Sequence, residues 1–155
     1  MYKKILAPLD GSELSECSLE HLKAVASGCQ VPEAVLLYVI EPVEEEYTHY
    51  RYHGIPEEVF DQAVKDAEAY AKDYIAKVAD RMKKEGIVVD TVIVRGRPAE
   101  EILEYAGKNG VDLIVLSTHG RSGISRWAFG SVTDRVLRHS NVPVLVIAPQ
   151  GCRAL

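Results

Sequence analysis

Five short apolar runs separated by amphipathic segments most restrict how this 155-residue chain can fold. The run AVLLYVI, residues 34–40, is apolar at every position, which is typical of strands covered on both faces in a parallel sheet. The segments between the runs repeat apolar residues at helical spacing. This alternation predicts a doubly wound, Rossmann-like α/β domain with an open parallel sheet. Predicted strands cover residues 4–9, 34–40, 88–94, 113–117 and 144–148, and predicted helices cover 12–27, 56–85, 98–109 and 131–140.

One domain is predicted over residues 1–150, followed by a loose tail at 151–155, because a chain of this length forms a single core. The long helix has acidic and basic residues opposite its apolar side. Its predicted inner face carries Val59, Ala63, Ala67, Tyr70, Tyr74, Ile75 and Val78.

The stretch 113–133 passes from an apolar strand through a glycine-containing loop into the start of a helix. Gly120, Gly123 and Gly130 allow tight turns and close approach of a ligand to the backbone. A helix beginning near Ser131 would present unpaired N–H groups and a partial positive charge. This succession of strand, glycine-containing loop and helix start predicts a phosphate-binding loop. The alternative is a connecting loop whose glycines only make turns.

A second loop with candidate chemistry, Asp10-Gly11-Ser12, follows the first predicted strand. In open parallel sheets, ligands bind beyond the carboxyl ends of strands where the strand order reverses. If the strand order is 3-2-1-4-5, the first and fourth strands are neighbours at the reversal, and this loop and Ser117-Thr118-His119-Gly120 face one crevice. An aspartate there could accept from a ribose hydroxyl or a base amine. Alternatively, Asp10 and Ser12 only cap the first helix, and Ser131 only caps the last.

Composition limits the classes of partner. The net charge of −5 argues against general nucleic-acid binding, although Arg121, Arg126, Arg135 and Arg138 gather around the glycine loop with Asp134 as the one acid. The cysteines Cys17, Cys29 and Cys152 form no CxxC or zinc spacing, which suits a reducing cytoplasm. No signal-peptide pattern or membrane-spanning run is present. We therefore expect a cytoplasmic protein that binds neither membranes nor nucleic acid.

Catalysis has little support in the sequence. Asp112, Ser117 and His119 could be imagined as a triad, but no GxSxG elbow surrounds the serine, and side chains alternate along a strand. The tyrosine-rich segment 41–56 contains His49 and His53 without a third ligand at a usual spacing, so no protein metal site is expected. Neither a Gly-Lys-Ser/Thr P-loop nor a GxGxxG is present. We predict a binding module rather than an enzyme.

These residues resemble the universal stress protein family over nearly the whole chain. ATP-binding members carry Gly-x-x-Gly, nine further residues, then Gly-Ser/Thr. Here Gly120, Gly130 and Ser131 match that motif, whereas Ser117 stands in place of the first glycine. The opening segment 5–12, the segment 96–100 and the run 136–146 are also similar to the family.

The resemblance implies a sheet of order 3-2-1-4-5 and an ATP site, with any magnesium held mainly by the phosphates. Asp10 and the backbone of Val39 would meet the adenosine. The remaining predicted site residues, around the ribose and phosphates or beside them, are Pro8, Leu116, Ser117, His119, Gly120, Arg121, Gly130, Ser131, Val132 and Thr133.

The resemblance also implies a homodimer formed through the last strand, Val144, Leu145, Val146 and Ile147, where an exposed apolar edge invites pairing. The resulting hypothesis is a nucleotide-responsive stress module in which occupancy changes the loop 120–129 and partners sense the change. The alternatives are a dimeric stress protein that binds no nucleotide and a weak ATPase or small transferase.

Overall fold

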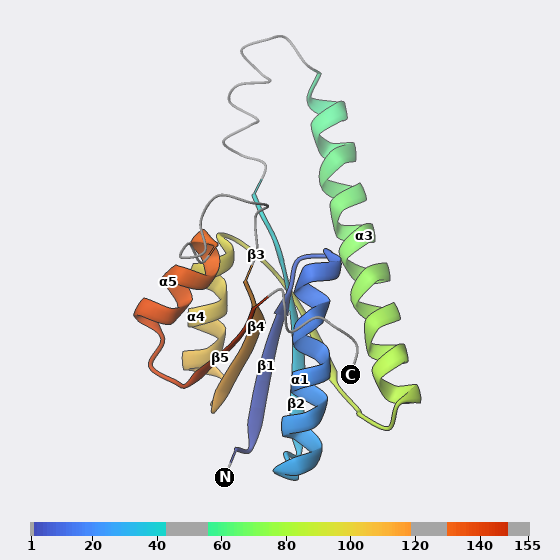
Figure 1. Cartoon of the computed structure of the whole chain (residues 1–155). Coiled ribbons are helices and arrows are strands. Elements are labelled where there is room, and N and C mark those ends of the chain that lie inside the picture. The colour runs from blue at the N-terminus through green and yellow to red at the C-terminus, as the bar shows by residue number, and fades with distance from the viewer. Residues whose placement is uncertain (1, 43–55, 119–129, 149–155) are drawn as a thin grey trace.

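The computed structural model describes residues 2–42, 56–118 and 130–148. It contains a five-stranded sheet in the order β3-β2-β1-β4-β5 with every pairing parallel, which confirms the predicted doubly wound α/β class (Figure 1). The strands are β1 Lys4–Leu9, β2 Glu33–Ile40, β3 Asp90–Arg95, β4 Leu113–Ser117 and β5 Val144–Ile147, and the helices are α1 Glu13–Gly28, α3 Glu57–Lys84, α4 Pro98–Lys108 and α5 Ser131–His139.

Helices cover both faces of the sheet, α1 and α3 on one and α4 and α5 on the other (Figure 1). Alternate residues of each strand enter the two cores, because successive side chains point to opposite faces. In β1, Ile5 and Ala7 pack on the α1/α3 side, while Leu6 packs on the α4/α5 side. Burial on both sides explains why the central strands have no polar alternation.

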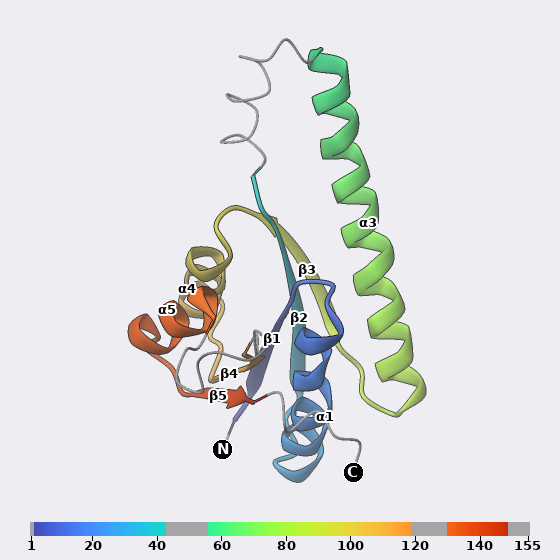
Figure 2. The same cartoon turned by 45° about the horizontal axis from the view of Figure 1, so that its top comes forward.

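Only the second half of α3 packs against the sheet, which corrects part of the predicted inner face. Ala71, Ile75 and Val78 are buried, but Val59 and Tyr70 are 56% and 55% exposed. The 28 residues of α3 extend about 42 Å at ~1.5 Å per residue. The eight residues of β2 reach only about 26 Å. The first half of the helix therefore extends beyond the sheet (Figure 2).

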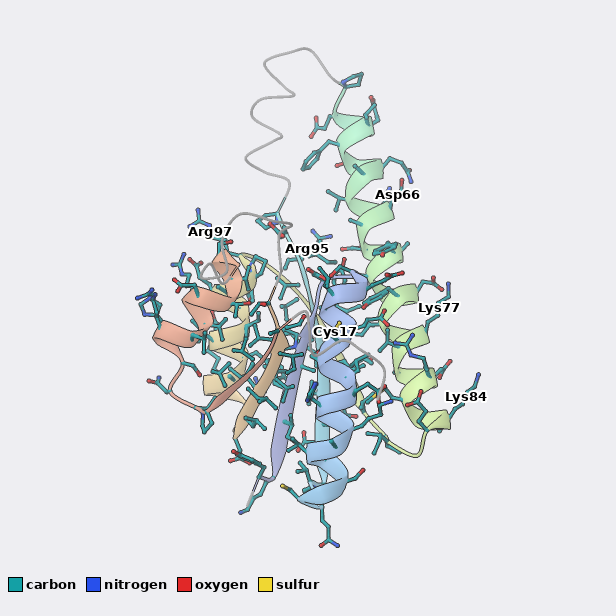
Figure 3. All side chains as sticks on the ribbon, in the orientation of Figure 1. Cys17, Asp66, Lys77, Lys84, Arg95 and Arg97 are labelled. Carbon is teal, nitrogen blue, oxygen red and sulfur yellow. The ribbon has the colours of Figure 1, made fainter. Side chains whose placement is uncertain are left out.

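Two smaller differences from the predicted elements concern β3 and α5. Strand β3 begins at Asp90, and Val88, predicted to lie in this strand, is 75% exposed. Leu137, predicted on the inner side of α5, is 36% exposed. Lys77 and Lys84 project from the outer side of α3, as predicted for its charged face (Figure 3).

Two of the three cysteines lie in the described part of the chain, Cys17 on α1 (Figure 3) and Cys29 at the C-cap of the same helix. Cys29 is a free thiol. Cys152 lies outside the described residues.

Asp112 links the start of β4 to the start of β1 through hydrogen bonds. Its Oδ2 accepts from the backbone N–H groups of Lys3 (2.6 Å) and Lys4 (2.9 Å), and these bonds lower the pKa of its carboxyl group. A carboxyl whose pKa is lower in the folded state stabilises the fold above its unfolded pKa, and this contribution is lost as pH falls through the folded pKa.

Asp112→Asn is therefore expected to lower the midpoint of urea unfolding at neutral pH. The difference from the unmodified protein should shrink once the pH falls below the range in which Asp112 is ionised. Urea titrations of both proteins at neutral and at acidic pH measure this. A difference of the same size at both pH values would contradict the assigned role of the carboxylate.

Candidate functional site

A cavity of about 680 Å³ opens at the carboxyl ends of β1, β2 and β4, beside the start of α5. The strand order reverses between β1 and β4, so the cavity lies at the topological switch point of the sheet. Its volume is within the range of small-molecule sites. The lining residues are Pro8, Leu9, Asp10, Ser15, Val39, Glu41, Pro98, Ile102, Leu116, Ser117, Gly130, Ser131, Val132 and Thr133.

Most of the predicted site residues meet in this cavity. The structure brings together nine of them, Pro8, Asp10, Val39, Leu116, Ser117, Gly130, Ser131, Val132 and Thr133. The other three, His119, Gly120 and Arg121, lie outside the described residues. Contact of any of them with a ligand stays a prediction.

Five lining residues were not predicted from the sequence: Leu9, Ser15, Glu41, Pro98 and Ile102. Ser15 belongs to the first turn of α1 and Ile102 to α4, where local sequence indicates only a helix. Pro98 belongs to the segment 96–100 noted for its family resemblance, which is the one sequence signal that could have identified it.

The β1–α1 turn places Asp10 at the cavity. Its Oδ1 accepts from the backbone N–H of Ser12 (2.9 Å) and from the Ser12 hydroxyl (2.6 Å). The Ser12 hydroxyl also accepts from the N–H of Ser15 (3.1 Å), so the predicted capping role of Ser12 is confirmed. Helix capping and exposure of a carboxylate to the cavity therefore occur in the same turn.

The opposite wall is the first turn of α5. Gly130 occupies the N-cap position, and no side chain caps this helix end. The Thr133 hydroxyl is buried and donates to the carbonyl of Ser117 at 3.3 Å, which joins α5 to the end of β4. First-turn N–H groups and the positive end of the helix dipole thus border a cavity that also contains Asp10.

The arginines of α5 are engaged in exposed ion pairs. Arg138 pairs with Asp134 at 2.8 Å, and Arg135 pairs with Glu100 of α4 at 2.9 Å. The pair with Arg138 lowers the pKa of the Asp134 carboxyl. The positive excess predicted around the loop is therefore partly neutralised at α5, while Arg121 and Arg126 lie outside the described residues.

A second cavity of about 420 Å³ adjoins the first and shares Asp10, Val39 and Glu41 with it. Tyr38 and Tyr70 form part of its wall. The Tyr70 ring stacks on Tyr74 with centroids 6.1 Å apart, and burial raises the pKa of the Tyr38 hydroxyl.

Ser117, the serine in place of the first motif glycine, is one of the lining residues, and it lies on the face of β4 opposite Leu116. Ser117 is the register partner of Ile147, whose side chain packs on the α1/α3 side. Leu116, its neighbour in β4, packs on the α4/α5 side, where the cavity also contains Ile102 and Val132. Strand alternation therefore places the Ser117 hydroxyl on the opposite face from Leu116.

Ser117→Gly is accordingly expected to change adenine-nucleotide affinity by less than about threefold, equivalent to under ~0.7 kcal/mol. Calorimetric titration of ATP into both proteins measures the difference. A gain of tenfold or more in the variant would mean that the hydroxyl obstructs the ligand.

The imagined catalytic triad does not assemble. Asp112 precedes β4 and bonds to Lys3 and Lys4, whereas Ser117 ends the strand. Five residues of extended chain separate them by about 17 Å. Within residues 2–42, 56–118 and 130–148, no three His, Cys, Asp or Glu side chains group as metal ligands, and no helix could cross a membrane.

Comparison with known proteins gives the family. The universal stress protein family model matches residues 1–148. The chain is 36% identical to the universal stress protein MJ0577 of Methanocaldococcus jannaschii, with 95% of each chain covered. The solved structure of MJ0577 superposes with a TM-score of 0.77, at 35% identity and 96% coverage of both chains.

Two more distant structures share the fold and contain adenine nucleotides. A universal stress protein in complex with cAMP has a TM-score of 0.68 at 21% identity, covering 95% of this chain and 97% of that one. A family protein from Arabidopsis thaliana with AMP bound has a TM-score of 0.64 at 15% identity, with coverages of 94% and 91%. By its sequence and its sheet topology, the chain belongs to the universal stress protein family.

Proposed function

We propose that this universal stress protein binds ATP and acts as a homodimeric, nucleotide-responsive module. The observation that carries the proposal is the convergence of nine predicted residues on one cavity at the switch point, bordered by the open N-terminus of α5. The adenine-nucleotide complexes of two structural neighbours support the same class of ligand.

The chemistry of the walls suits the two ends of a nucleotide. Asp10 can accept from ribose hydroxyls or a base amine, and the Val39 backbone offers a donor and an acceptor beside apolar side chains. At the other end, N–H groups of Gly130 and Ser131 can donate to phosphate oxygens. Magnesium would be held mainly by the phosphates.

Binding with slow hydrolysis at most is the activity we propose. Among the described lining residues, Asp10 and Glu41 are the titratable side chains, and the described part of the wall presents no lysine, arginine or histidine. A cytoplasmic location, and a nucleotide-dependent change in the loop 120–129, remain part of the proposal.

The test is calorimetric titration of ATP, AMP and cyclic AMP into protein stripped of carried-over nucleotide, with and without Mg²⁺. Saturable one-to-one binding with ATP favoured would support the proposal. Preference for AMP or cyclic AMP would keep the nucleotide site and overturn the choice of ATP. No binding of any of the three would favour the alternative, a dimeric stress protein without a nucleotide.

The proposed dimer interface is the outer edge of β5. On the side that faces β4, the carbonyl of Pro143 accepts from the N–H of Ile114, and the carbonyl of Ile147 accepts from the N–H of Thr118. Backbone groups point alternately to the two sides of a strand, so those of residues 144 and 146 point to the outer edge. Val144, Leu145 and Val146 are half-buried in the single chain. An apolar edge strand with outward N–H groups favours pairing with a second copy.

Val146→Pro is expected to convert the dimer to a monomer, because proline removes an outward N–H without disturbing the bonds to β4. Analytical ultracentrifugation at micromolar concentration measures the change. Val88→Pro, at an exposed position near the opposite edge of the sheet, is the control and should remain dimeric. A Val146→Pro protein that sediments as a dimer would show that this edge is not the interface.

A further inference from the structure

We propose that Ser12 is a positioning residue for the nucleotide site, which holds the Asp10 carboxylate in its binding orientation through a side-chain hydrogen bond. The inference rests on the proposed function, since it concerns how Asp10 meets the ligand. Ser12 itself does not line either of the two cavities, so any effect on the ligand must pass through its neighbours.

The bond that carries the inference is charge-assisted and short. Ser12 donates twice to Asp10 Oδ1, from its backbone N–H at 2.9 Å and from its hydroxyl at 2.6 Å. Two donors on one carboxylate oxygen restrict both rotation and tilt of the group. A carboxylate has about four acceptor positions, so it can accept from a ligand while Ser12 holds it.

The hydroxyl of Ser12 does more than capping requires. A capping serine needs only a lone pair for an N–H of the first turn, which here is that of Ser15 at 3.1 Å. The single hydroxyl hydrogen is directed instead to Asp10. Capping would be satisfied equally by a hydroxyl that donated to solvent, so the bond to Asp10 is an additional constraint.

Hydrogen bonds that do not involve the Ser12 hydroxyl hold the backbone around Asp10. The Ser12 hydroxyl therefore acts mainly on the Asp10 side chain. The buried Ser15 hydroxyl donates to the Ser12 carbonyl at 2.8 Å and accepts from the Asp10 N–H at 3.4 Å. Gly11 adopts φ +84°, and the Tyr70 hydroxyl would lie 2.9 Å from a Cβ at this position. With the turn held from both sides, losing the Ser12 hydroxyl removes one of the two Ser12 donors to the Asp10 carboxylate and leaves the backbone N–H bond in place.

A held carboxylate loses less rotational freedom when the nucleotide binds, and this raises affinity without a new ligand contact. Ser12→Gly is the informative variant, because glycine is a good N-cap residue and preserves helix α1 while it removes the hydroxyl. We expect Ser12→Gly to weaken ATP binding about tenfold, with Ser12→Thr, which keeps a hydroxyl, within about threefold of the unmodified protein.

The decisive readout is a double-mutant cycle with Asp10→Ala, measured by calorimetric titration of ATP into the full chain. If Ser12 acts through Asp10, Ser12→Gly should cost less than about twofold once Asp10 is alanine. Urea unfolding of each variant shows that the protein tested is folded.

Equal losses in both Asp10 backgrounds would overturn the inference and assign Ser12 a purely structural role, as would a Ser12→Gly protein with unchanged affinity. Either result leaves the proposed function standing, because ATP still binds the unmodified chain. If the unmodified chain binds no ATP, the proposed function fails and this inference fails with it.

Discussion

Gly130→Val is expected to abolish ATP binding while the protein remains folded. Gly130 is the N-cap residue of α5 with φ −56° and ψ 152°, a conformation that valine adopts without strain. Because Gly130 lines the cavity, the valine branches would occupy space beside the first N–H groups of the helix, where we propose that the phosphates bind. Losing two charge-assisted hydrogen bonds, at about 1.5–3 kcal/mol each, predicts at least ~100-fold weaker binding.

The matched control is Gly107→Val, which places the same side chain on an exposed position of α4. A Cβ at Gly107 has no neighbour within 4 Å, so the Gly107→Val protein should bind ATP with the affinity of the unmodified protein. Calorimetric titration of ATP into the three proteins makes the comparison. Full affinity in the Gly130 variant would mean that phosphates do not approach the start of α5.

Leu36→Ala is expected to cost a large share of the free energy of unfolding. Leu36 is fully buried in the middle of β2, between Ala7 of β1 and Thr91 of β3. Truncating such a side chain removes its transfer free energy and leaves a cavity, together about 3–5 kcal/mol. Domains of this kind have only about 5–15 kcal/mol in total.

Urea unfolding followed by circular dichroism measures the loss, and Leu137→Ala is the control with the same chemical change. Leu137 is 36% exposed on α5, so its truncation should cost under about 1 kcal/mol. Similar losses at the two positions would contradict the burial that separates them.

The fold could be predicted because each layer leaves its own period in the sequence. The apolar runs of β1, β2 and β4 reflect burial on both faces, and the amphipathic helices reflect burial on one. The extension of α3 could not be predicted. Helical periodicity shows that one side of residues 57–70 is apolar, but not that the sheet ends before it reaches them.

Site residues that lie at turns and helix ends could be predicted from the sequence. Site residues that reach the cavity only because the helices pack against the sheet could not. Asp10, Gly130 and Ser131 stand at strand and helix ends, which glycine and capping residues reveal. Ser15 reaches the same cavity from the first turn of α1 and Ile102 from within α4, and no local pattern distinguishes them from ordinary helix residues. The effect of Ser117 depends on which face of β4 it occupies, which only the register with β5 reveals.

The most direct test of nucleotide binding in this cavity is a crystal structure of the stripped protein grown with ATP and Mg²⁺. We predict adenosine against Asp10 and the Val39 backbone, and phosphates at the N–H groups of Gly130 and Ser131. ATP at another place, or an empty cavity at a concentration that saturates the protein in solution, would contradict it.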